Sequence, residues 1–257
     1  MASDKQSLEE KLIDWLGSEG YRLEYLAHKA FVDAGVKSVL GHYVESSEGK
    51  PREIDVMAFL ATSGRDPVLL ARVLCECKYS RRQPWVLLAS GLNPDLFLDW
   101  YSTPQSRSVR EHSHRVDQYA DVLHQCWHFA EGHKLAHNLL QAFGSKNRDT
   151  AFNSLQKIAN AAWDCVETAE RRGKEAHVVA FPCLVVDAPL YFAWFDFEAD
   201  QFAVKRVPYG RVSWSGCRSG TLVDVVHADA LSDYAEATRN TFERVLQVVE
   251  GLLTGLR

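Results

Sequence analysis

The sequence predicts a single α/β domain built on a central mixed β-sheet flanked by helices. Three observations lead to this prediction. The 257 residues are 46% hydrophobic and 25% charged, which is typical of a soluble globular protein. Segments with helical apolar spacing alternate with segments rich in β-branched and aromatic residues. The chain has no internal repeat, low-complexity tract or linker, so the order helices, strands, helices, strands, helix favours one α/β unit.

In the first half of the chain, helices are expected at 8–16 and 22–34, the second ending at Gly35. Extended segments follow at 36–45, 54–61 and 68–79, with a turn at 62–67. The last two segments form an antiparallel pair, and the strand at 36–45 is expected beside them.

In the second half, 84–104 is expected to be loop with short helical pieces. Residues 110–143 are expected to be helical, with a break near Gly132. The remaining expected elements are a helix at 149–172, strands at 178–186, 191–197, 202–207 and 222–226, and an amphipathic helix at 232–253.

Composition excludes several classes of protein. The net charge is −5, which excludes a generally basic nucleic-acid coat protein but leaves room for a local basic groove. No apolar stretch approaches the roughly 20 residues of a membrane span, and the first residues lack an apolar signal core. The six cysteines form no Cys-x-x-Cys pair and are interpreted as buried thiols. We therefore expect a cytoplasmic protein without membrane contact.

Charged residues within apolar strands are the most informative feature of the sequence. Asp55 lies between Ile54 and Val56, and Glu76 and Lys78 share one face of the strand at 68–79. Such charges are costly to bury unless they are paired or bind a metal. Folding the hairpin about 62–67 brings Asp55 towards Glu76, so two carboxylates and one ammonium should converge.

This pattern resembles the PD-(D/E)xK nuclease superfamily, whose members include restriction endonucleases. The matching residues are Asp55 and the tripeptide Glu76-Cys77-Lys78, while the proline of the family name is replaced by Glu53-Ile54 ahead of Asp55. Glu24, on the preceding helix, matches a glutamate that often joins the metal site in the superfamily. The resemblance covers about residues 20–80.

The resemblance implies a restriction endonuclease-like core at about 20–175, with additional strands and a helix at 176–257, in one nuclease domain over 1–257. An alternative division has a catalytic half at 1–175 and a separate β-rich half. The resemblance also implies Mg²⁺, or Mn²⁺, held by Asp55, Glu76 and the backbone carbonyl of Cys77, with Glu24 as a weaker ligand. Mg²⁺ prefers oxygen ligands and needs only one or two carboxylates in addition to the substrate phosphate. Lys78 would orient or help deprotonate the attacking water and offset negative charge.

Other residues are weaker candidates for substrate binding. Arg81 and Arg82 follow the Glu76 strand and could contact the nucleic-acid backbone or be simple surface residues. Gln156, on the helix at 149–172, is a second candidate for binding substrate. The thiols of Cys75 and Cys77 should face away from the carboxylates.

Four histidines, His124, His128, His133 and His137, form two His-x-x-x-His pairs. On a helix, residues at this spacing share a face, which is a zinc-binding geometry. Because no His-Glu-x-x-His motif is present, polar residues on a helix surface are the preferred interpretation.

The resulting prediction is a Mg²⁺-dependent endodeoxyribonuclease of restriction, phage defence or repair. DNA is the expected partner, with RNA as an alternative substrate. A homodimer is expected, because cutting both strands usually needs two sites, and a partner protein in a defence or repair system is compatible with this role. The competing interpretations are a catalytically silent nucleic-acid-binding module of the same fold, and a structural ion pair between Glu76 and Lys78 or Arg82.

Overall fold

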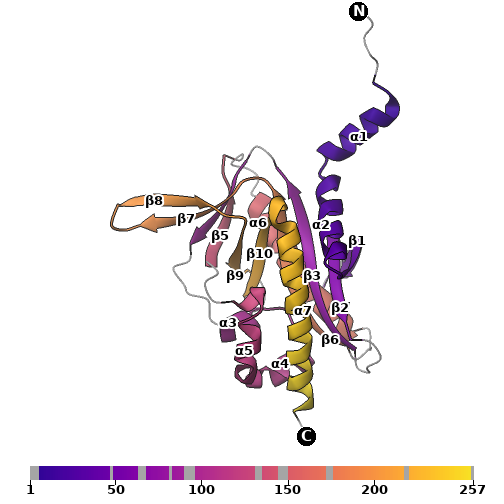
Figure 1. Cartoon of the computed structure of the whole chain (residues 1–257), viewed down its shortest axis with the longest axis vertical. Coiled ribbons are helices and arrows are strands. Elements are labelled where there is room, and N and C mark those ends of the chain that lie inside the picture. The colour runs from indigo at the N-terminus through magenta and orange to yellow at the C-terminus, as the bar shows by residue number, and fades with distance from the viewer. Residues whose placement is uncertain are drawn as a thin grey trace, which may run out of the picture.

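The fold is known from a computed structural model. It describes residues 6–46, 49–62, 68–80, 83–89, 96–130, 135–143, 150–171, 176–216 and 220–255. A ten-stranded mixed sheet runs through this part of the chain, in the order β1-β2-β3-β6-β10-β9-β5-β4-β7-β8 (Figure 1). The predicted α/β class, with a large mixed sheet flanked by helices, is therefore confirmed.

The strands are β1 (Lys37–Glu45), β2 (Pro51–Ala61), β3 (Val68–Tyr79), β4 (Trp85–Ala89), β5 (Leu135–Gln141), β6 (Ala176–Asp187), β7 (Leu190–Asp196), β8 (Gln201–Arg206), β9 (Tyr209–Trp214) and β10 (Thr221–His227). The α-helices are α1 (Leu8–Ser18), α2 (Tyr21–Asp33), α3 (Leu96–Tyr101), α4 (Arg107–His112), α5 (Ala120–Leu123), α6 (Thr150–Arg171) and α7 (Leu231–Thr254). Short 3₁₀ segments lie at Ser113–Tyr119, Trp127–Phe129 and Ala228–Ala230.

The antiparallel unit β1-β2-β3 agrees with the prediction, since β2 pairs antiparallel with both of its neighbours. Beyond it the sheet becomes parallel, because β3 pairs with β6 along its whole length, from Val68↔Ala176 to Tyr79↔Asp187. The β6 strand is buried along most of its length, as expected for a strand with neighbours on both sides and helices on both faces.

Three parts of the chain differ from the prediction. The expected helix at 110–143 is wrong, because only short helical turns occupy its first part and β5 ends it. The β5 strand pairs with β4 on one side and with β9 on the other. Neither of these strands was predicted, since β4 lies in the segment 84–104 that was expected to be loop with short helical pieces, and β9 lies between the strands expected at 202–207 and 222–226. Strands β4, β5 and β9 are all short. Their pairing with distant strands outweighs the low intrinsic preference of leucine, alanine and glycine for strand conformation.

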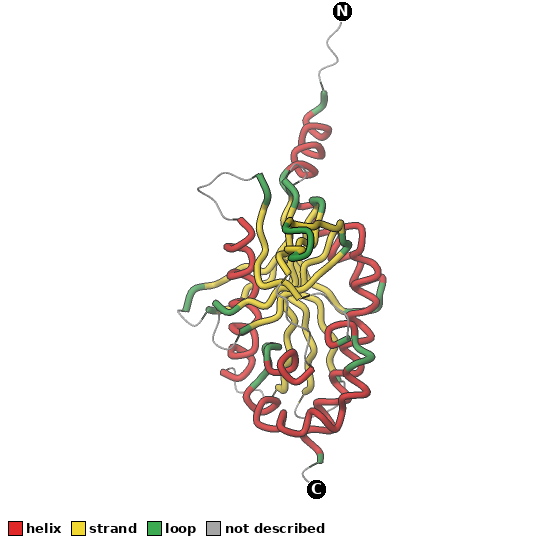
Figure 2. Tube along the Cα trace, turned by 90° about the vertical axis from the view of Figure 1, so that its left-hand side faces the viewer, coloured by secondary structure: helices red, strands yellow, loops and turns green. Residues whose placement is uncertain are grey.

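Helices cover both faces of the sheet, which Figure 2 shows as strands lying between helices on either side. Helices α2 and α7 pack on one face, over a core that includes Phe31, Val73 and Phe242. Helix α6 packs on the other face, over a second core that includes Leu74, Leu155 and Leu184. Neighbouring residues of β3 therefore serve different cores, as the two-residue period of a strand requires.

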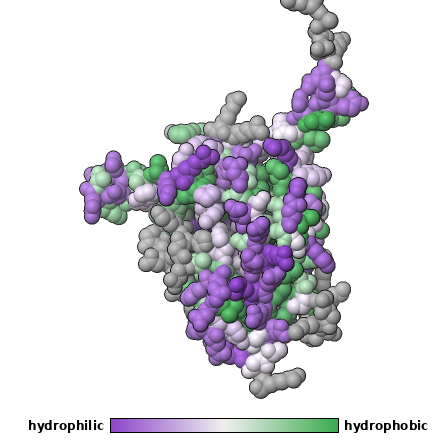
Figure 3. Space-filling model, viewed as in Figure 1, coloured by the Kyte–Doolittle hydropathy of each residue, from purple (hydrophilic) through white to green (hydrophobic). Residues whose placement is uncertain are grey.

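The two ends of the chain differ in how they pack. Helix α7 buries eleven residues, including Tyr234 and Val249, so this helix is part of the core. Hydrophilic side chains cover its outward side (Figure 3). Helix α1 buries none of its residues and projects from the body (Figure 1). Within the described residues, no helix is both long and apolar enough to cross a membrane.

Candidate functional site

Asp55 lies at the point where the side chains of β2 pass from one hydrophobic core to the other. Val56 belongs to the core under α2 and α7, whereas Ile54 belongs to the core under α6. In a regular strand these two residues would share one face. Gly41, on the adjacent stretch of β1, adopts φ +59°, a conformation that glycine tolerates better than other residues. At this irregular point of β2, the Asp55 carboxylate reaches β3. Its Oδ2 accepts a hydrogen bond of 2.7 Å from the Cys77 backbone N–H.

Glu76 and Lys78 lie on the face of β3 that is turned towards α6. The Glu76 side chain is 1% exposed, and its Oε1 lies 2.5 Å from Lys78 Nζ. Cys75 is part of the opposite core, and Cys77 packs against that core. The thiols of Cys75 and Cys77 therefore face away from Glu76, as predicted, and the convergence of Asp55, Glu76 and Lys78 is present.

Lys157 on α6 is a site residue that the sequence analysis missed. Its Nζ lies 2.5 Å from Glu76 Oε2 and 3.9 Å from Asp55 Oδ1, so one ammonium contacts both carboxylates. Its sequence neighbour Gln156, the residue singled out above, is exposed. The only available signal was that Lys157 directly precedes the buried Ile158 on the edge of the apolar stripe of α6.

Like charges and burial raise the pKa values of both Glu24 and Asp55. Partial burial, followed by repulsion from Asp55, Glu53 and Glu76, raises the pKa of Glu24 to about 6. Desolvation, followed by repulsion from Glu76, raises the pKa of Asp55, although the Cys77 N–H and two lysines oppose the shift. Glu24 therefore lies within the electrostatic field of the pair, and the carboxylates together favour a cation.

Lys78 keeps its proton in the absence of metal. Burial acts to lower its pKa, but the charge and the hydrogen bond of Glu76 outweigh burial and raise the pKa above its usual value. An ammonium held in this way can donate hydrogen bonds and offset negative charge, whereas it cannot accept a proton.

The donor set suits a hard cation that completes its coordination with water and substrate. Glu76 Oε2 is buried without a hydrogen bond, and its contact with Lys157 is an ion pair by distance. The described residues contain no group of three or more His, Cys, Asp or Glu side chains arranged to hold a metal. Asp55 and Glu76 are two carboxylates that share the contact with Lys157, and Mg²⁺ needs only one or two protein carboxylates. Cys77, whose carbonyl is the third ligand that the resemblance implies, stands between Glu76 and Lys78 in the sequence of β3.

The histidines do not form the helical pairs considered from the sequence. His124 is exposed after α5, His128 is buried in a 3₁₀ turn, and His137 is exposed on β5. The shared helix face is therefore wrong, because the segment is not one helix. His133, Arg81 and Arg82 lie outside the described residues.

A second polar cluster lies in the opposite core and was also missed. Asp224 on β10 accepts from Arg211 Nε at 3.0 Å and from the Tyr234 hydroxyl at 3.1 Å, and it lies 3.0 Å from His128 Nε2. Burial acts to raise the pKa of Asp224, but Arg211 and His128 outweigh burial and lower it to about 2. Burial lowers the pKa of His128, which is thus neutral at pH 7. All these side chains are buried, so this cluster is a structural network.

Comparisons with known proteins add no information about the function of these residues. No protein family, no curated protein and no solved structure matches the chain.

Proposed function

We propose that this protein is a metal-dependent nuclease that hydrolyses phosphodiester bonds, with DNA as its substrate. The observation that carries the proposal is the convergence of Asp55, Glu76 and Lys78 on the α6-facing side of the β2-β3 pair, with Lys157 contacting both carboxylates. Buried carboxylates without enough neutral donors are costly to maintain unless a cation joins them. The arrangement also supports the proposal of a restriction endonuclease-like core.

Each side chain has a role in this proposal. Asp55 and Glu76 would hold Mg²⁺ or Mn²⁺, together with the Cys77 carbonyl, and Glu24 would extend the acidic surroundings. The bound ion would lower the pKa of the attacking water and neutralise charge on the phosphoryl oxygens. Lys78 would donate to the attacking water and hold it in line with the phosphorus. Lys157 would balance the negative charge of the carboxylates before substrate arrives, and of the phosphate afterwards.

The test is cleavage of supercoiled plasmid, linear duplex, single-stranded DNA and RNA with Mg²⁺, Mn²⁺ or EDTA. The variants are Asp55→Ala and Lys78→Ala. The matched controls are Asp33→Ala and Lys29→Ala, which break an exposed ion pair on α2. We expect metal-dependent cutting of DNA that falls at least 100-fold in the two site variants and stays unchanged in the two controls.

Full activity of folded Asp55→Ala would overturn the proposal. Cutting of RNA alone would replace the DNA substrate by RNA. Salt-sensitive binding of nucleic acid without any cutting would favour a catalytically silent binding module. Sedimentation of the active protein, alone and on duplex, tests the proposed homodimer, which would supply a second site for the second strand.

A further inference from the structure

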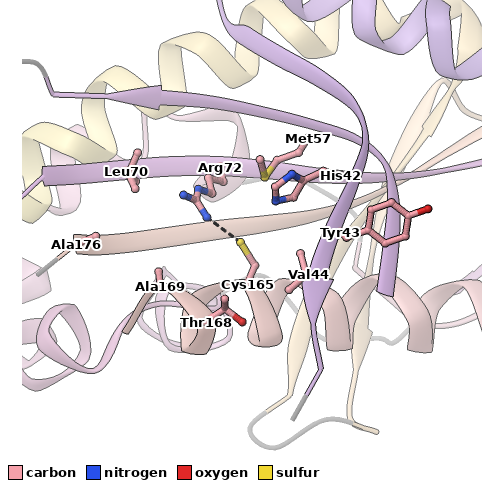
Figure 4. A pocket seen from close by; sticks show the side chains of 10 residues that line it. All are labelled: His42, Tyr43, Val44, Met57, Leu70, Arg72, Cys165, Thr168, Ala169 and Ala176. Atoms are coloured by element: carbon pink, nitrogen blue, oxygen red, sulfur yellow. Dashed lines mark hydrogen bonds between the residues drawn. The ribbon is translucent and has the colours of Figure 1, made fainter. Parts of the chain in front are cut away.

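A partly open cavity of about 230 Å³ lies between the β1-β2-β3 edge of the sheet and helix α6 (Figure 4). Its lining is mainly apolar, with Val44, Met57, Leu70, Ala169 and Ala176 on its walls. The polar lining side chains come from β1, β3 and α6. They are His42, Tyr43, Arg72, Cys165 and Thr168.

Arg72 is the notable residue in this lining. Its Nη1 donates to the Cys165 thiol at 3.1 Å, and its Nε is buried without a hydrogen-bond partner. Arg72 is half-buried, and sulfur is a weak acceptor, so the buried part of its guanidinium has no strong hydrogen-bond acceptor within the described residues. In the described part of the chain, no acidic side chain forms an ion pair with Arg72. Figure 4 shows the guanidinium in the space between the strands and α6.

An anion with a compact apolar body suits both the apolar walls of the cavity and the Arg72 guanidinium. A carboxylate can accept two parallel hydrogen bonds from a guanidinium, and the apolar walls favour a hydrocarbon body. A cavity of roughly 150 Å³ holds a benzene ring, so the present volume has room for a ring and its carboxylate. We propose that this cavity binds a small organic carboxylate, such as an aromatic or branched aliphatic acid, through Arg72.

The cavity is distinct from the Asp55–Glu76 site. Arg72 and Glu76 share the α6-facing side of β3, with the buried Leu74 between them. They are four positions apart along the strand, which corresponds to roughly 13 Å. The proposal therefore stands whether or not the protein is a nuclease. It would, however, place a ligand on the same strand and the same helix that hold Glu76 and Lys157.

The test is a ¹⁹F NMR titration of the full chain with 4-fluorobenzoate. The neutral analogue 4-fluorobenzyl alcohol tests whether binding requires the negative charge of the ligand. Acetate, used as a competitor, tests whether binding requires an apolar body beside the carboxylate. We expect saturable binding of 4-fluorobenzoate, at least tenfold weaker binding of the alcohol, and poor competition by acetate. Arg72→Met should weaken 4-fluorobenzoate binding at least tenfold. The control Arg107→Met, at a side chain that is 83% exposed, should leave binding unchanged.

A second variant keeps the test decisive if Arg72→Met does not fold. Ala169→Leu fills the cavity from α6 and leaves the guanidinium in place, so it should abolish binding. The proposal is overturned if wild-type protein shows no saturable binding, or if the alcohol binds as tightly as the acid. It is also overturned if Ala169→Leu, or folded Arg72→Met, retains wild-type affinity.

Discussion

A single buried carboxylate, that of Glu76, is shared by two lysines from different elements. Lys78 comes from the same strand, and Lys157 comes from a helix far along the chain. Without metal, the two ammoniums are the only positive charges that the structure places against Glu76 within its described residues. At the residue scale, the stability of the metal-free protein therefore depends on Lys157.

Lys157→Met should lower the free energy of unfolding of the metal-free protein by about 1–2 kcal/mol. The value lies below the range for fully buried pairs because the Lys157 side chain is 35% exposed. Urea denaturation in EDTA measures the effect. Gln156→Met, at the exposed neighbouring position, should change stability by less than about 0.5 kcal/mol. Equal effects of the two substitutions would show that Lys157 does not stabilise the buried carboxylate.

The His128–Asp224 network should make stability depend on pH. Because burial lowers the pKa of His128 in the folded protein, the unfolded chain binds a proton below about pH 6.5 that the folded chain does not bind. Stability should therefore fall as pH decreases from about 6.5. A further loss should come below about pH 4, where unfolded Asp224 binds a proton that the folded form, with a pKa of about 2, excludes.

His128→Gln removes the first of these two losses. Urea unfolding at pH 7.5, 6.0 and 5.0 should give a shallower decline for this variant than for wild type. The neutral wild-type imidazole donates from Nε2 towards Asp224 and accepts at Nδ1 from Thr241, 3.0 Å away. Parallel pH curves for the two proteins would rule out a neutral His128 in the fold.

At the scale of elements, β9 joins the two parts of the sheet. It pairs antiparallel with β10 on one side and makes a short parallel pairing with β5 on the other. Gly210 lets this strand approach the β4 strand closely, because a Cβ there would overlap the Leu87 side chain. Leu87 is fully buried and has little room to move.

Gly210→Ala should therefore destabilise the fold by about 1–3 kcal/mol through overpacking. The control is Gly17→Ala on α1, where nothing lies within 4 Å of the added Cβ. Thermal unfolding followed by circular dichroism compares the two variants. A Gly210→Ala protein as stable as wild type would mean that β9 does not pack against Leu87.

At the scale of the whole molecule, stability comes from two cores on opposite faces of one sheet. Helix α1 contributes to neither, and its apolar residues Leu8 and Ile13 are 69% and 68% exposed. Its ring contact between Trp15 and Tyr21, with centroids 6.0 Å apart, is local. Helix α7, in contrast, supplies buried residues along its whole length.

A chain that starts at Gly20 should keep its free energy of unfolding within about 0.5 kcal/mol of wild type, because it loses no buried side chain. Removing residues 245–257 from the other end should prevent folding, since it takes Val245, Val249 and Leu252 from the core. Urea denaturation of both truncated chains tests this contrast. A large loss of stability without α1 would show that this helix is part of the core.

Several elements could be predicted from periodicity alone. The expected strand at 68–79 coincides with β3, and the expected helix at 149–172 differs from α6 by one residue at each end. These elements are long and their patterns are regular, so local preference and tertiary packing agree. Strands β4, β5 and β9 have five to seven residues each, and pairing with distant strands decides their conformation.

The sequence by itself indicated that Asp55, Glu76 and Lys78 would meet, because the turn expected at 62–67 folds the strand that carries Asp55 back against the strand that carries Glu76 and Lys78. Only the tertiary structure decided that Lys157 would contact both carboxylates, that Arg72 would lack a strong acceptor, and that Asp224 would join His128 and Arg211. Lys157 and His128 lie far along the chain from their partners, and Arg211 meets Asp224 through β9, a strand that the sequence did not predict. Their proximity results from the order of strands in the sheet and from the face on which each helix packs.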